Sequence, residues 1–151
     1  MAELVIQNLV LGMVQTNVYL LQNRETKEMI VIDPADAAGR IIRKIDEMEG
    51  KPAAILLTHA HFDHIMAAEK IRDTYHIPIY LEESEEEVLE DPNLNLSGSL
   101  GTSDSLKGDI LVRDGEELNI AGFAIQVLHT PGHTQGSCCY YFPEQQILFS
   151  G

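Results

Sequence analysis

Thr58-His59-Ala60-His61-Phe62-Asp63-His64 is the stretch of this 151-residue sequence that most narrowly limits its fold and its chemistry. Three of the six histidines lie in it, directly after the apolar run Ala53 to Leu57. In an extended chain, side chains two positions apart project to the same side, so His59 and His61 can face one site. Asp63 and His64 follow where the chain can turn into a helix, and they can face a neighbouring position. Imidazole and carboxylate bind zinc, iron or manganese, so the spacing predicts a metal site without fixing the metal.

A second histidine segment, His129-Thr130-Pro131-Gly132-His133-Thr134, follows the apolar run Phe123 to Leu128. Pro131-Gly132 forces a turn, which would aim His133 back over the same sheet edge. Taken alone, a histidine after Pro-Gly is as often a turn residue as a ligand. Beside the first segment, it becomes a candidate ligand.

The apolar pattern around the two segments predicts strands and helices that alternate in the first half of the chain, and mostly strands in the second half. Strands are expected over residues 5–14, 17–22, 29–32, 53–57 and 79–81, and helices over 36–49 and 64–75. Later strands are expected near residue 110 and over 117–120, 123–128, 137–142 and 146–149, after a long loop over 91–107. This order predicts an α+β fold with two sheets packed face to face and helices outside.

Composition limits the partners of the protein. A formal net charge of −14 repels phosphate backbones, so we expect no nucleic acid. No apolar run approaches the roughly 20 residues that cross a bilayer, and the start Met1-Ala2-Glu3 lacks the basic segment of a signal peptide. We therefore expect no membrane partner and a cytoplasmic location. The acidic cluster Glu82 to Glu87 is expected as a solvated helix face, with a lid or docking surface as the alternative.

Several residues outside the histidine segments allow two interpretations. Asp33 either orients a ligating imidazole or caps the helix that follows it. His129 either lies behind the ligands or packs in its turn, whereas His76 is expected on the surface. Cys138 and Cys139 are adjacent, and neighbours on a strand point to opposite faces, so no disulfide is expected between them. One of the two is expected in the core.

The two histidine segments resemble those of the metallo-β-lactamase superfamily, above all the small glyoxalase II-like (hydroxyacylglutathione hydrolase-like) hydrolases. Further matching stretches are Ile32-Asp33-Pro34, Asn95-Leu96-Ser97, Asp114-Gly115 and the run from Thr130 to Gly136. The resemblance implies a four-layer αββα sandwich in a single domain, 1–151. Relatives place a metal-bridging aspartate in a Phe-x-Gly-Asp pattern, and this sequence ends at Phe149-Ser150-Gly151. We therefore expect the C-terminal part to be missing and the second half of the sandwich to be incomplete. Met66 departs from the small residue that is usual in the family.

The resemblance also implies roles for individual residues. His59, His61 and His133 look like the ligands of a first metal, and Asp63 and His64 like ligands of a second. Asp63 is in addition the candidate catalytic residue. Zinc is the expected metal, with two sites in the family, and iron or manganese are possible.

By this resemblance the expected function is a metal-dependent hydrolase of small thioesters that acts through a metal-bound hydroxide. A thiolate leaving group suits such a site, because thiol pKa values near 8.5 make protonation of the leaving group nearly unnecessary. The alternatives are a mononuclear iron sulfur dioxygenase of the same superfamily and an inactive, truncated metal-binding domain. β-Lactamase activity ranks lower, because the best-known enzymes of that type lack a histidine directly after the aspartate. The expected partners are a small-molecule thioester and a second copy of the chain that covers the incomplete sandwich.

Overall fold

Six strands form the first sheet of the computed structural model, which describes residues 2–12, 15–60, 62–91, 108–131 and 136–150, with the backbone alone for 62 and 63. These strands are β1 Leu4–Leu11, β2 Thr16–Asn23, β3 Glu28–Ile32, β4 Lys51–Leu56, β5 Ile79–Glu82 and β6 Ile110–Val112, in that order across the sheet. β1 to β3 pair antiparallel, and β3 to β6 pair parallel. Met29 to Ile32 of β3 are all 0% exposed, as expected of a central strand that is covered on both faces.

The second sheet is an antiparallel meander in the order β10-β9-β8-β7. Its strands are β7 Glu117–Ile120, β8 Phe123–His129, β9 Cys138–Phe142 and β10 Ile147–Phe149. Ala121 and Gly122 join β7 to β8 with φ angles of 56° and 83°. Positive φ at both central residues fits a two-residue type I′ hairpin. The amide of Asn23 donates to the carbonyl of Ala121 at 2.9 Å, which ties this hairpin to β2 of the first sheet.

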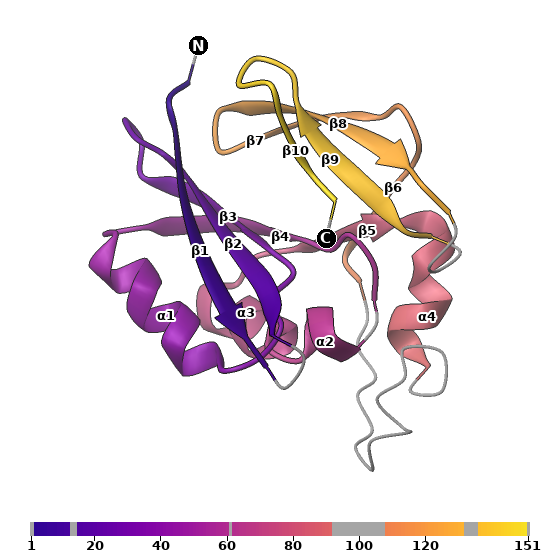
Figure 1. Cartoon of the computed structure of the whole chain (residues 1–151), viewed down its shortest axis with the longest axis horizontal. Helices are drawn as coiled ribbons and strands as arrows, with labels where there is room; N and C mark the ends of the chain where they lie inside the picture. Colours follow the sequence, from indigo (N-terminus) through magenta and orange to yellow (C-terminus); the bar gives the residue numbers. More distant parts are fainter. Residues whose placement is uncertain (1, 13–14, 61, 92–107, 132–135, 151) are drawn as a thin grey trace.

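Helices cover the face of the first sheet that points away from the second sheet (Figure 1). They are α1 Ala38–Glu47, α2 Phe62–Ile65 and α3 Ala68–Tyr75, and a 3-10 helix, η1 Glu83–Glu85, leads into α4 Glu86–Glu90 after β5. No helix of the described residues lies beyond the second sheet (Figure 1). The α+β sandwich is confirmed, and the described part has three of the four expected layers.

The predicted helix over 64–75 is wrong in one respect, because the chain forms two helices, α2 and α3, with a break at Met66 and Ala67. The N–H of Ala67 donates to the carbonyl of Pro34 at 3.0 Å instead of continuing a helical pattern. The inward positions within this stretch are as predicted, since Ile65, Ala68 and Ile71 are all buried. The predicted helix over 36–49 is shorter, at 38–47, and the strand expected to reach residue 14 ends at Leu11.

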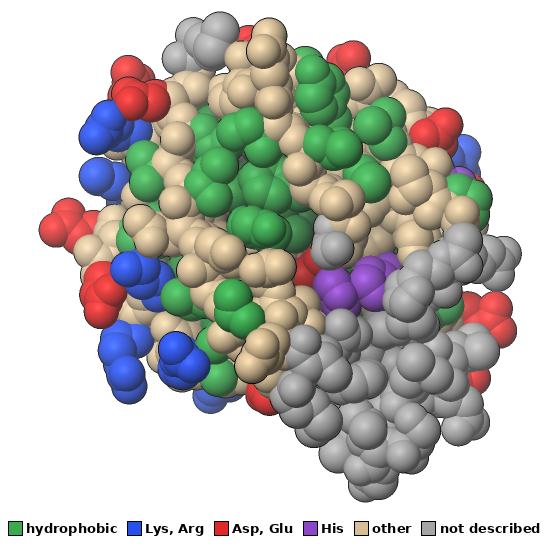
Figure 2. Space-filling view, viewed as in Figure 1, with side chains coloured by type: hydrophobic (Ala, Val, Ile, Leu, Met, Phe, Trp, Pro, Cys, Tyr) green, Lys and Arg blue, Asp and Glu red, His purple; other side chains and the backbone are tan. Residues whose placement is uncertain are grey.

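Two apolar cores lie on opposite faces of the first sheet. One packs β-strand side chains against the helices, around Ile41, Ile45 and Ile71, and the other fills the space between the sheets, around Phe123 and Tyr140. Apolar surface also stays open where β10 meets the first sheet. There, Ile6 and Leu148 are exposed beside a hollow of about 320 Å³, and Figure 2 shows a broad apolar patch on this face. None of the described helices is long and apolar enough to cross a membrane.

Candidate metal centre

Three parallel strands bring the polar segments of the candidate site to one edge of the first sheet. Asp33 follows β3, Thr58 to His64 follow β4, and Glu82 ends β5. Because β3, β4 and β5 are parallel neighbours, their carboxyl ends meet, and such edges are where open α/β sheets place their sites. The second sheet joins them there, since the N–H of Cys138 donates to the carbonyl of Thr58 at 2.8 Å.

The structure brings together the two histidines of the first segment whose side chains it describes. The rings of His59 and His64 have centroids 3.9 Å apart at an interplanar angle of 52°, and both side chains are buried. His61 and His133 lie outside the described residues, and Asp63 is described by its backbone alone, in α2. Among the side chains that the structure describes, no three His, Cys, Asp or Glu form a metal-binding group. The five-residue ligand set, and the catalytic role of Asp63, therefore stay predictions.

Asp33 is a buried carboxylate that lies beside this pair. Its Oδ1 accepts from the N–H of Thr58 at 2.9 Å, and its Oδ2 accepts from the Thr58 hydroxyl at 2.6 Å. The same Oδ2 lies 2.9 Å from Nδ1 of His64. Asp33 does not cap the helix, because α1 begins at Ala38 with Ala37 as its N-cap and no side-chain capping bond. The capping interpretation of Asp33 is therefore wrong, and the orienting one stays a prediction that its position beside His64 supports.

These contacts fit a metal. A carboxylate beside Nδ1 of His64 favours the tautomer with the proton on Nδ1, which places the lone pair on Nε2, the atom that can coordinate. Nδ1 of His59 lies 3.4 Å from the Thr58 hydroxyl, whose own proton goes to Asp33, so this hydroxyl can accept from His59. The positions of Asp33 and the Thr58 hydroxyl beside the two imidazoles are thus compatible with rings that bind zinc or iron.

The prediction that the acidic cluster forms one solvated face is wrong for two of its members. Glu82 and Glu85 are only 3% and 0% exposed, whereas Glu83 and Glu87 are exposed. The carboxylate of Glu85 accepts from the N–H of Ala60 at 2.7 Å and from the N–H of Gly136 at 2.9 Å. The composition of the cluster hides this difference. The signal that could have revealed it is the position of Glu82 at the end of a parallel strand, next to the ends that carry the other site residues.

Neither cysteine is in a disulfide, as expected, and both are buried. Burial raises the pKa of the Cys138 thiol to about 12, so it stays protonated at neutral pH. Its neighbour Tyr140 donates its hydroxyl to the carbonyl of Leu57 at 2.7 Å, and complete burial raises the pKa of that phenol well above its usual value. Both residues therefore support the strand end that precedes the first histidine segment.

The remaining histidines lie at the margin of the centre or away from it. The backbone N–H of His129 donates to the carboxylate of Asp114 at 2.8 Å, and its ring atom Nε2 lies 3.9 Å from Oε2 of Glu82. Its side chain thus faces the buried carboxylate that ends β5. His76 is exposed at the C-terminal end of α3, as predicted.

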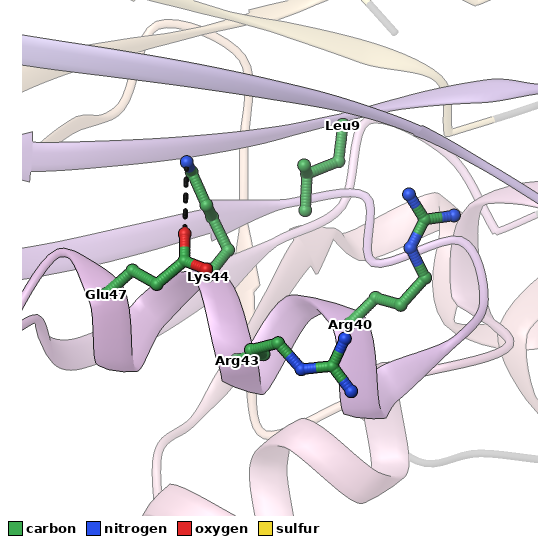
Figure 3. Close-up of a pocket in the computed structure, with 5 residues that line it drawn as sticks. All are labelled: Leu9, Arg40, Arg43, Lys44 and Glu47. Atoms are coloured by element: carbon green, nitrogen blue, oxygen red, sulfur yellow. Dashed lines mark hydrogen bonds and ion pairs between the residues drawn. The ribbon is translucent and has the colours of Figure 1, made fainter.

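A separate hollow of about 150 Å³ lies along α1 and is lined by Leu9 and by charged side chains (Figure 3). Arg40, Arg43 and Lys44 supply positive charge there, and Lys44 pairs with Glu47 at 3.4 Å. Its lining contains none of the histidines, so it is not part of the candidate metal centre.

Comparison with known proteins places the chain in a family. The family model described as the metallo-beta-lactamase superfamily matches residues 11–151, and the chain belongs to this superfamily. The probable metallo-hydrolase YqgX of Bacillus subtilis is 40% identical over 142 residues, which are 93% of this chain and 66% of YqgX. The chain thus spans about two thirds of the length of the curated relatives that it matches.

Solved structures agree with this placement. The crystal structure of BLEG-1 B3 metallo-beta-lactamase has 43% sequence identity and a TM-score of 0.91, and the match covers 97% of this chain and 71% of that one. The crystal structure of TTHA1623 in a di-iron-bound form has 31% identity and a TM-score of 0.78, with 96% and 71% covered. The superfamily resemblance of the histidine segments is therefore confirmed.

Proposed function

We propose that the protein is a metal-dependent hydrolase and that its substrates are small thioesters. The observation that carries the proposal is the pair of buried imidazoles, His59 and His64, oriented by Asp33 at the carboxyl ends of parallel strands. The similarity to YqgX, a probable metallo-hydrolase, supports a hydrolase. We propose zinc as the metal, with iron as the alternative, because the similar TTHA1623 has been solved with two irons.

A bound metal of this kind supplies a water of lowered pKa and polarises a carbonyl group. The chain itself supplies polar groups beside both rings: Asp33 lies 2.9 Å from Nδ1 of His64, and the Thr58 hydroxyl lies 3.4 Å from Nδ1 of His59. Neither Cys138 nor Tyr140 is suited to act as a nucleophile or proton donor, because burial raises both pKa values far above neutral pH. A thioester needs no side-chain acid for its leaving group, since thiolates leave without prior protonation.

Hydrolysis of a hydroxyacylglutathione and of a short acyl-coenzyme A ester, measured after loading with zinc or iron, tests the proposal. We expect metal-dependent turnover that His59→Ala abolishes and His76→Asn leaves unchanged. His76 is exposed, and asparagine tolerates its positive φ of 55°. A metal-loaded protein that hydrolyses neither ester would refute the thioester proposal.

A second candidate function is β-lactam hydrolysis, and the likeness to BLEG-1 favours it. The histidine directly after Asp63 speaks against this activity, whereas the 43% identity to BLEG-1, a B3 metallo-beta-lactamase, favours it. A chromogenic cephalosporin assayed beside the thioesters separates the two functions, and oxygen consumption by the iron-loaded protein tests the sulfur dioxygenase alternative.

A further inference from the structure

Glu85 connects the two loops that carry the predicted metal ligands. It lies in η1, after β5, and its side chain is 0% exposed. One carboxylate oxygen accepts from the N–H of Ala60, and the other accepts from the N–H of Gly136. These two residues are 25 and 51 positions away from Glu85 in the chain. A single buried side chain therefore joins three segments that the sequence keeps far apart.

The two amides belong to the histidine segments themselves. Ala60 stands between His59 and His61, and Gly136 comes three residues after His133. Burying a carboxylate is costly unless hydrogen bonds replace its water. At 2.7 and 2.9 Å, the two bonds have the lengths typical of charge-assisted bonds, which are stronger than neutral ones. The carboxylate thus fixes the separation of the two loops through their backbones.

Gly136 shows how closely the second loop approaches this carboxylate. A Cβ atom at Gly136 would lie 2.4 Å from the backbone nitrogen of Glu85 and 2.6 Å from its Cβ. It would also lie 2.8 Å from Oε2 of Glu82. Two of these atoms cannot move without moving η1, so any side chain here would push the loop away. Glycine is therefore required at 136, because a larger residue could not come close enough to donate its backbone N–H to Glu85.

We propose that Glu85 is a positioning residue that sets the distance between the two metal-ligand loops and so determines the affinity for the metal. The inference rests on the proposed function to the extent that both loops carry ligands. It does not depend on the substrate. Glu85 acts through the backbones of the loops, which distinguishes it from Asp33, which acts on imidazole rings.

Replacing Glu85 with glutamine tests the proposal. Glutamine has the same size but offers one acceptor oxygen and one NH₂ group, so one of the two backbone amides must lose its bond. We expect zinc affinity, measured by competition with a chelator, to fall about 10–100-fold, as is usual when a residue behind the ligands is changed. In metal-free protein, the amide proton resonance of Ala60 or Gly136 should move upfield. Glu87→Gln is the matched control, because Glu87 is exposed and the charge change is the same.

A purely structural role would lower the unfolding midpoint and shift an amide resonance but leave zinc affinity as it is in the wild type; that result overturns the proposal. If Glu85→Gln does not fold, Gly136→Ala serves instead, because it keeps the carboxylate and moves the loop, and it should lose affinity to a similar degree. Wild-type affinity in Gly136→Ala would also overturn the proposal. Wild-type protein that binds zinc but hydrolyses no thioester refutes the proposed substrate alone.

Discussion

Asp33 accepts hydrogen bonds from Thr58 and also lies beside Nδ1 of His64. A substitution that removes only its negative charge tests whether that charge supports metal binding. Asparagine tolerates the positive φ of 51° at this position and keeps the size of the side chain. The NH₂ group of the asparagine would lie beside Nδ1 of His64, so no carboxylate would favour the tautomer with the proton on Nδ1. We expect Asp33→Asn to weaken zinc binding about 10–100-fold. Competition with a chelator measures this, with Asp36→Asn as the control. Unchanged affinity would rule out orientation of the ligand by Asp33.

Cys138 gives the stability of the protein a defined dependence on alkaline pH. Its pKa is about 12 in the folded state against an ordinary value of 9.0, so between these values the folded chain keeps a proton that the unfolded chain has lost. The unfolded state then binds fewer protons, and the free energy of unfolding falls as pH rises through this window. Tyr140 acts in the same direction.

Urea unfolding at several pH values above 9 measures this fall. Cys138→Ala should show a shallower decline than the wild type, although its stability at neutral pH is lower because a buried group has been removed. Equal slopes in the two proteins would contradict the assignment to Cys138.

At the residue scale, the sequence predicted contacts between residues that lie close together along the chain. His59 and His64 come together because they lie in one short segment, and Asp33 is a possible partner because ligating imidazoles usually donate to a carboxylate. Glu85 was not recognised, because its bonds reach 25 and 51 residues along the chain and no spacing rule covers them. Its acidic neighbours also made it look like part of a solvated face.

At the scale of elements, the hydroxyl of Tyr140 in β9 is one of the groups that support the end of β4. Tyr140 donates to the carbonyl of Leu57, one residue before the histidine segment begins. We expect Tyr140→Phe to lower the free energy of unfolding by about 1–3 kcal/mol, because a buried carbonyl loses its short hydrogen bond and keeps only the weak one from the Cys138 thiol at 3.8 Å. Tyr141→Phe, on the same strand but partly exposed, should cost less. Urea denaturation compares the two, and equal losses would show that the bond to Leu57 has no special weight.

Strands were the elements that the sequence predicted best, because alternation or continuous burial marks them directly. All ten strands of the described residues correspond to predicted ones. The break between α2 and α3 could not be predicted, because it depends on a bond from Ala67 to Pro34 across the fold. The short helices η1 and α4 were also missed as separate elements, since the acidic cluster has little apolar periodicity.

For the whole molecule, metal binding should appear as thermal stability. A ligand that binds only the folded state stabilises it by about 2.7 kcal/mol at a hundred times its Kd. For a chain of this size the unfolding midpoint should rise by roughly 5–10 °C. We expect this shift with zinc in the wild type and in His76→Asn, and its loss in His59→Ala. Differential scanning fluorimetry with and without a chelator measures it, and a full shift in His59→Ala would place the metal elsewhere.

The two sheets differ in how far apart their paired residues lie along the chain, and this difference bears on the order of folding. The meander from β7 to β10 joins strands that are neighbours in sequence, whereas β3, β4 and β5 pair across intervening helices. Closing short loops costs less entropy, so we expect the hairpins to form before the parallel pairs. The loops that Glu85 joins can meet only after both sheets exist. We therefore expect the metal centre to be assembled late, so that a newly made chain would gain the ability to bind metal only near the end of folding.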